Sequence, residues 1–289
     1  MTLPPFALHR PGSLDEVEDL LAQHGDDAVV YCGGTELLLV MKLGLAAYPN
    51  LVDLKGIPEL RVLEERDGRL CVGAAVTHRE LESSPFVHRL VPALAEMERR
   101  VANVRVRSVG TLGGNLCFSD PHSDPATFLL ASGAELVCRR GAAQRTIQIG
   151  EFVRGPYETA LGRHELLTEI RIPVLPARAA LVHEKFATHE RPALTVSCFV
   201  RAEDGHVAEA RIAVGSVSAT PARVSEAENL LVGLPVESGG DQLRVAGGIA
   251  AEAVVPLADL NGSVEYKRNL VRVFVTRCCT TAVERLSLE

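Results

Sequence analysis

Apolar residues at the start of the chain recur at two different spacings. Between positions 14 and 21 they follow one face of a helix, and Ser13 with Glu16 three positions later forms the capping-box pattern of a helix start. Gly25 is the expected end of that helix. The pattern then predicts a strand, a glycine turn and a second helix, over residues 28–31, 33–34 and 37–43.

The rest of the first half continues this alternation, whereas the second half places its strands before its helices. Further strands are expected at 51–54, 70–76 and 165–173, and a helix at 87–101. The apolar runs 194–201 and 207–214 flank Asp204-Gly205, a pair typical of a tight hairpin turn. Amphipathic helices are expected over 225–231, 242–253 and from 264 onward. The first half is therefore predicted to be α/β and the second half α+β.

Chain length and one proline-rich stretch predict two domains. A chain of 289 residues is long enough for two domains that each bury their own core. The stretch that contains Pro173, Pro176 and Ala177 is the best candidate for a linker. We expect one domain over residues 1–175 and a second over 179–289.

Charge and cysteine content exclude several classes of protein. The 30 Lys+Arg and 37 Asp+Glu residues give a net charge of −7, which disfavours a nucleic-acid partner. The N-terminus lacks a secretory pattern and no apolar run approaches the roughly 20 residues of a membrane span, which predicts a cytoplasmic protein without stable membrane insertion. Seven cysteines without a Cys-x-x-Cys pair indicate neither a disulfide framework nor a metal site.

The first candidate binding motif is Cys32-Gly33-Gly34-Thr35-Glu36-Leu37, between an expected strand and an expected helix. Two glycines without Cβ atoms would let main-chain amides approach a phosphate, and Thr35 could donate its hydroxyl. Taken alone, a Gly-Gly pair at this place is more often an ordinary turn.

The second candidate motif is Gly110-Thr111-Leu112-Gly113-Gly114-Asn115-Leu116, followed by Asp124 at an expected helix start. Taken alone, it fits a loop with an N-capping aspartate. Together, the two glycine pairs could hold one diphosphate, while Asp124 accepts from a ribose or adenine group. The polar donors would be Thr35, Thr111 and Asn115.

An ordered series of short motifs runs through nearly the whole chain. Its members are Gly33-Gly34 continued by Met41-Lys42, then 51–54, 73–74, 107–115, 120–121, Asp124, 165–173, 184–186, 220–223 and 262–268. This series resembles the FAD-binding medium subunit of the xanthine dehydrogenase and carbon monoxide dehydrogenase group. The resemblance implies an α+β protein with a vanillyl-alcohol-oxidase (PCMH) type FAD-binding domain of two α/β subdomains, followed by a small α+β C-terminal domain.

The same resemblance implies which residues contact FAD. The first motif and Thr111 to Asn115 would hold the pyrophosphate, and Asp124 would bind the adenosine side. Lys185 would stabilise negative charge on the reduced flavin ring, and Val101 stands where some relatives carry an aromatic residue. No side chain is expected to be catalytic. The full expected set is Cys32, Gly33, Gly34, Thr35, Glu36, Leu37, Val101, Thr111, Leu112, Gly113, Gly114, Asn115, Asp124, Leu167 and Lys185.

The implied function is electron transfer within a molybdenum hydroxylase. FAD would take electrons from two-iron iron–sulfur clusters of a small partner subunit and deliver them to an external acceptor, while the organic or gaseous substrate reacts on a large subunit that carries the molybdenum cofactor. Relatives imply a dimer of heterotrimers. Two other classes remain: a free-standing FAD-dependent oxidase or reductase, and a non-catalytic nucleotide-binding assembly protein. No covalent attachment motif supports the first, and the intact glycine pairs speak against the second.

Overall fold

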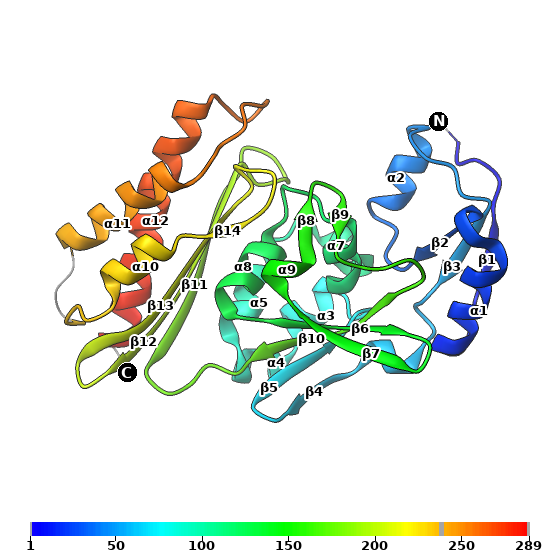
Figure 1. Ribbon diagram of the computed structural model, residues 1–289, viewed down its shortest axis with the longest axis horizontal. Helices are drawn as coiled ribbons and strands as arrows, with labels where there is room; N and C mark the ends of the chain where they lie inside the picture. The colour runs from blue at the N-terminus through cyan, green and yellow to red at the C-terminus, as the bar shows by residue number, and fades with distance from the viewer. Residues whose placement is uncertain (1, 237–239, 288–289) are drawn as a thin grey trace.

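Three units of secondary structure follow one another along the chain (Figure 1). The computed structural model describes residues 2–236 and 240–287. The first unit is a parallel sheet of three strands in the order β1-β3-β2, with two helices and one 3-10 turn. Its elements are β1 (Ala7–His9), α1 (Leu14–His24), the 3-10 turn η1 (Gly25–Asp27), β2 (Ala28–Tyr31), α2 (Leu37–Lys42) and β3 (Asn50–Asp53).

The start of the first unit follows the predicted pattern. The Ser13 hydroxyl accepts the amide of Glu16 at the start of α1, and the amide of Gly25 donates to Leu21 at its end. The Glu16 carboxylate accepts from the amide of Gly12, so the predicted capping box is only half formed.

The second unit contains an antiparallel sheet whose central strand comes last in the sequence. The order is β4-β5-β10-β6-β7, and β8 and β9 form a separate pair. The strands are β4 (Leu63–Arg66), β5 (Arg69–Gly73), β6 (Glu135–Arg140), β7 (Ala143–Gln148), β8 (Val153–Gly155), β9 (Glu158–Thr159) and β10 (Leu166–Pro173). The helices are the 3-10 turn η2 (Pro58–Arg61), α3 (His78–Ser83), α4 (Pro85–Leu90), α5 (Pro92–Glu98), α6 (Val104–Val109), α7 (Leu112–Phe118), α8 (Asp124–Ser132) and α9 (Ile149–Phe152).

The prediction of a single helix over 87–101 is wrong. The structure has two short helices there, α4 and α5, which meet at Val91 and Pro92. Proline has no amide hydrogen to continue a helix and forces the preceding residue out of the helical region; Val91 accordingly has φ −142° and ψ 70°.

The third unit is a four-stranded antiparallel sheet covered by helices, with strands before helices as predicted. Its order is β11-β12-β13-β14, and Asp204 and Gly205 both have positive φ, at 49° and 75°, in the turn between β12 and β13. The elements are β11 (Ala179–Phe186), β12 (Leu194–Glu203), β13 (His206–Gly215), β14 (Ala222–Arg223), α10 (Ser225–Leu231), α11 (Gly240–Ala253) and α12 (Val264–Ser287). The α+β class is confirmed.

The third sheet is packed on both faces. α12 contacts β11 and β12, and the helices α10 to α12 lie on the outer face in Figure 1. On the other face, α8 of the second unit contacts β12 and β13, and Thr127 and Thr195 share a hydrogen bond of 2.8 Å. The core of the first two units also includes Leu181 and Phe199 from this sheet. The division into 1–175 and 179–289 stays a proposal, because the packing continues across it.

None of the helices in the described ranges has both the length and the apolar character needed to cross a bilayer. No group of three or more His, Cys, Asp or Glu side chains within those ranges is arranged to hold a metal ion.

Candidate functional site

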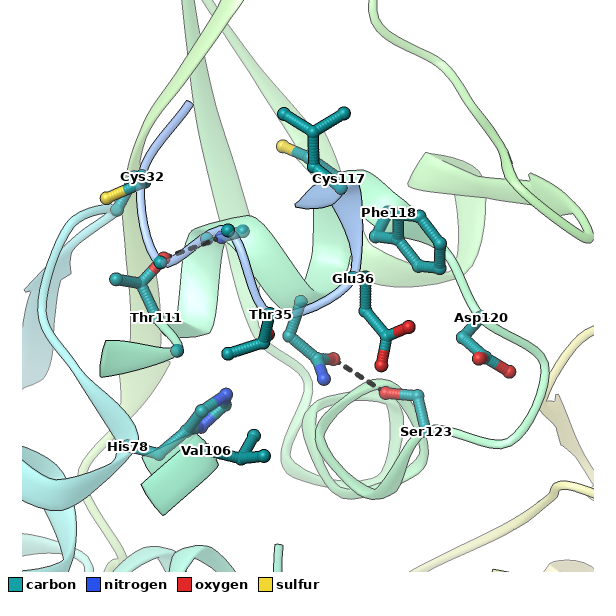
Figure 2. A pocket seen from close by; sticks show the side chains of 18 of the residues that line it. Cys32, Thr35, Glu36, His78, Val106, Thr111, Cys117, Phe118, Asp120 and Ser123 are labelled. Atoms are coloured by element: carbon teal, nitrogen blue, oxygen red, sulfur yellow. Dashed lines mark hydrogen bonds between the residues drawn. The ribbon is translucent and has the colours of Figure 1, made fainter. Parts of the chain in front are cut away.

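A cavity of about 500 Å³ lies where the three units meet. The first unit contributes residues of the segment 29–39, the second contributes residues between 74 and 124 and between 161 and 167, and the third contributes Glu190 and Arg191. The volume is within the roughly 300–1,000 Å³ typical of cofactor sites. Figure 2 shows side chains of this lining converging from separate helices and loops.

The two candidate motifs meet in this cavity. A Cβ atom on Gly33 would lie 2.4 Å from the carbonyl oxygen of Val109 and 2.7 Å from Cα of Gly110, so only glycine permits this contact of main chain with main chain. Segments about eighty positions apart in sequence therefore form one wall.

The first motif carries free main-chain donors. The amides of residues 33–37 have no hydrogen-bond acceptor among residues 2–236 and 240–287. All five residues line the cavity. Unpaired amides on a cavity wall are costly unless a ligand or water accepts from them, and consecutive amides favour an anion.

The second motif is not a turn but the start of a helix. Thr111 is the N-cap of α7, and its hydroxyl accepts the amide of Gly114 at 3.0 Å. The amides of Leu112 and Gly113 donate to the carbonyls of Val76 and Ala74. The sequence interpretation assigned free donors to both motifs, but internal hydrogen bonds already satisfy these amides of the second.

Most of the expected residues are brought together at the cavity. Leu112 is fully buried behind the wall, and Lys185 is not among the lining residues. The expected residues that line the cavity are Cys32, Gly33, Gly34, Thr35, Glu36, Leu37, Val101, Thr111, Gly113, Gly114, Asn115, Asp124 and Leu167.

Asp124 and Lys185 contact each other. The Nζ of Lys185 lies 2.8 Å from Oδ2 of Asp124 and donates to the carbonyl of Arg100 at 2.9 Å. The Nε2 of His183 lies 3.4 Å from the other carboxylate oxygen. Asp124 is 3% exposed, so the lysine charge compensates a buried carboxylate. Contact of either residue with FAD stays a prediction.

Sequence reasoning missed an arginine that connects the third unit to the other two. The guanidinium of Arg191 lies 2.8 Å from the carboxylate of Glu36 and 2.5 Å from that of Asp120. Next to it, Glu190 accepts from the side chain of Asn103 at 2.8 Å. These residues lie in the connection between β11 and β12, where no local pattern marks a binding residue; only their nearness to Lys185 in sequence was a signal.

His122 is a second missed residue of the lining. Its Nε2 lies 3.2 Å from Asp259, which also contacts the buried Lys267 at 2.7 Å. The hydrogen bond with Asp120 raises the pKa of His122; burial opposes this effect, and Asp259 adds to it. Burial alone would raise the pKa of Asp120, but the hydrogen bonds of His122 and the charge of Arg191 lower it. This network joins the cavity wall to the loop before α12.

The two cavity thiols are not nucleophiles. Burial raises the pKa of Cys32, and its hydrogen bond with Thr111 only partly offsets this. Burial also raises the pKa of Cys117 to about 12, although the residue keeps exposed surface. Thiols with raised pKa values stay protonated near neutral pH and are poor nucleophiles.

We expect the contribution of His122 to stability to depend on pH. A pKa that is raised in the folded state gives stability that is fully present below the unfolded value of about 6.5 and is lost as pH rises through the folded value. His122→Gln should therefore lower the free energy of unfolding by up to about 1 kcal/mol at pH 5.5 and by less at pH 9. Urea unfolding of both proteins at both pH values measures this, and a deficit that grows toward alkaline pH would contradict it.

Comparisons with known proteins agree with this geometry. The family described as FAD binding domain in molybdopterin dehydrogenase matches residues 4–175, and the CO dehydrogenase flavoprotein C-terminal domain matches residues 186–282. The chain is 32% identical to the carbon monoxide dehydrogenase medium chain of Hydrogenophaga pseudoflava over 287 residues, which cover 99% of each chain. It is 30% identical to the nicotine 6-hydroxylase medium subunit of Paenarthrobacter nicotinovorans, over 99% of this chain and 100% of that one.

A solved structure of carbon monoxide dehydrogenase from Hydrogenophaga pseudoflava superposes with a TM-score of 0.94, at 32% identity and with 99% of each chain covered. The resemblance and fold class predicted from the sequence are therefore confirmed, together with FAD as the cofactor of the family. The chain belongs to the FAD-binding medium subunits of the molybdenum hydroxylases, and it is an oxidoreductase component.

Proposed function

We propose that this chain holds FAD in the cavity and that electrons from iron–sulfur clusters of a partner subunit pass through it to an external acceptor. The observation that carries the proposal is the run of five unpaired amides at residues 33–37, on a wall completed by the contact of Gly33 with Val109 and Gly110. A diphosphate is the part of FAD that such amides would bind.

The chemistry of the remaining lining fits the same group. The cavity wall includes carboxylates such as Glu36 and Asp120, so main-chain amides rather than net positive charge would hold the diphosphate. Val101 and Leu167 offer aliphatic surface. The chain has no Trp and only 4% aromatic residues, so we propose that aliphatic side chains cover much of the flavin ring.

The bound FAD would supply electron acceptance and release, whereas this chain would supply binding and orientation. The amides of residues 33–37 would fix the diphosphate, and the start of α7 would form the wall beside it. Arg191 holds the third unit against Glu36 and Asp120, which keeps the walls of the cavity together. Lys185 compensates Asp124, so that a buried carboxylate can remain at the cavity wall without an unpaired charge.

The relatives support the proposed assembly. They are named as a medium chain of carbon monoxide dehydrogenase and a medium subunit of nicotine 6-hydroxylase, which are components of enzymes with several subunits. We propose a large subunit with the molybdenum cofactor and a small subunit with two-iron iron–sulfur clusters as partners, in a dimer of heterotrimers.

Removing FAD from the purified complex tests the electron route. We expect the substrate still to reduce the iron–sulfur clusters, which electron paramagnetic resonance detects. Electron transfer to a dye acceptor should fall to background and return when FAD is added back. Undiminished transfer in the flavin-free complex would show that electrons leave by another route.

Gly114→Val tests whether the diphosphate lies between residues 33–37 and the wall formed by α7. A Cβ atom at Gly114 would lie 2.8 Å from the hydroxyl of Thr111, which must shift, and the branched side chain would enter the cavity, so we expect FAD occupancy to be lost. Flavin absorbance per chain measures this, and full occupancy would argue against the assigned position. Gly113→Ala is the contrasting variant: its Cβ would lie 2.6 Å from the carbonyl oxygen of Ala74, and we expect it to lower the free energy of unfolding by about 1–3 kcal/mol.

A further inference from the structure

We propose that His78, in contact with the buried Glu98, donates a hydrogen bond from Nε2 to the diphosphate in the cavity. This inference rests on the proposed function, because it requires FAD to occupy the cavity. Neither residue belongs to the motifs that the sequence singled out, and the resemblance assigns neither of them a role.

His78 and Glu98 form a buried pair behind the cavity wall. The Nδ1 of His78 lies 2.6 Å from Oε2 of Glu98, and the two side chains are 3% and 0% exposed. The other oxygen, Oε1, is buried and has no partner among the described residues. A carboxylate with this little solvation needs a positive neighbour, and His78 is the group that contacts it.

The second nitrogen of His78 is left for a ligand. No described residue bonds to Nε2, and His78 is a lining residue of the cavity. Because Glu98 engages Nδ1, an imidazolium would present Nε2–H as a donor. A neutral ring that donates from Nδ1 would instead present Nε2 as an acceptor, which repels phosphate oxygens.

The backbone places this ring beside the first motif. His78 is the first residue of α3, after the capping box of Thr77 and Glu80, and its amide donates to the carbonyl of Gly110. A Cβ atom built on Gly110 would lie 3.3 Å from Cδ2 of His78 and 3.6 Å from Cγ2 of Thr35. Gly110 is therefore the shared neighbour of the imidazole and of Thr35, and Figure 2 draws these two side chains near each other.

The charges of the lining single out His78 among the cations. The acidic lining residues are Glu36, Asp120, Asp124, Glu165 and Glu190, and the cationic candidates are Arg191, His78 and His122. Arg191 and His122 already contact carboxylates of the lining itself. The carboxylate partner of His78 lies outside the lining and contacts Nδ1, so Nε2 is left without a carboxylate partner.

Competition binding on the full chain tests the proposal. The chain is first freed of FAD, and the rebinding of FAD is then measured in the presence of ADP or of adenosine. ADP carries the diphosphate and adenosine does not. The double variant His78→Leu with Glu98→Gln removes the Nε2 donor and should weaken ADP binding about ten- to a hundred-fold, with adenosine binding unchanged. His88→Gln, a change of a histidine on α4 that is outside the cavity lining, is the matched control and should alter neither.

Two outcomes would overturn the proposal. They are normal ADP binding in the double variant His78→Leu with Glu98→Gln, and an equal loss of ADP and adenosine binding in that variant. The double variant leaves no unpaired buried charge, so the chain should fold. Failure of the unaltered chain to bind FAD would instead refute the proposed function together with this inference.

Discussion

The contact of Gly33 with the main chain at Val109 and Gly110 is the constraint on which the cavity depends. It brings two units together at a distance that no side chain would allow. The amides of residues 33–37 line the cavity and have no acceptor among the described residues. The donors that we propose for the diphosphate therefore lie next to a contact between two backbones.

The sequence predicted the elements whose signals are local. Ser13, Gly25 and Asp204-Gly205 carry caps and turns whose geometry follows from a few neighbouring residues, and the structure has them where expected. The prediction of one helix over 87–101 was wrong because apolar spacing outweighed the backbone effect of Pro92. The second motif, taken alone, fitted a loop, but Gly113 and Gly114 lie in the first turn of the short helix α7, which gives the same sequence pattern.

Only the part of the candidate site that the two glycine motifs form could be predicted from the sequence. That the motifs around Gly33 and Gly113 form one wall follows from the resemblance and from the idea of a shared diphosphate. The contributions of Arg191 and His122 could not be predicted, because each depends on partners from another unit, Glu36 for one and Asp259 for the other. Contacts of this kind are set by tertiary packing, of which a single sequence gives no local sign.

The position of β10 has a consequence for the order of folding. This strand lies between β5 and β6, with Ile170 opposite both Val72 and Leu136, yet it is the last strand of its sheet to leave the ribosome. The hairpins on either side cannot join until about residue 173 has been made, so the sheet must close over long sequence separations, which slows folding. Apolar strand edges stay open during synthesis, and nascent chains are exposed to aggregation until that one strand arrives.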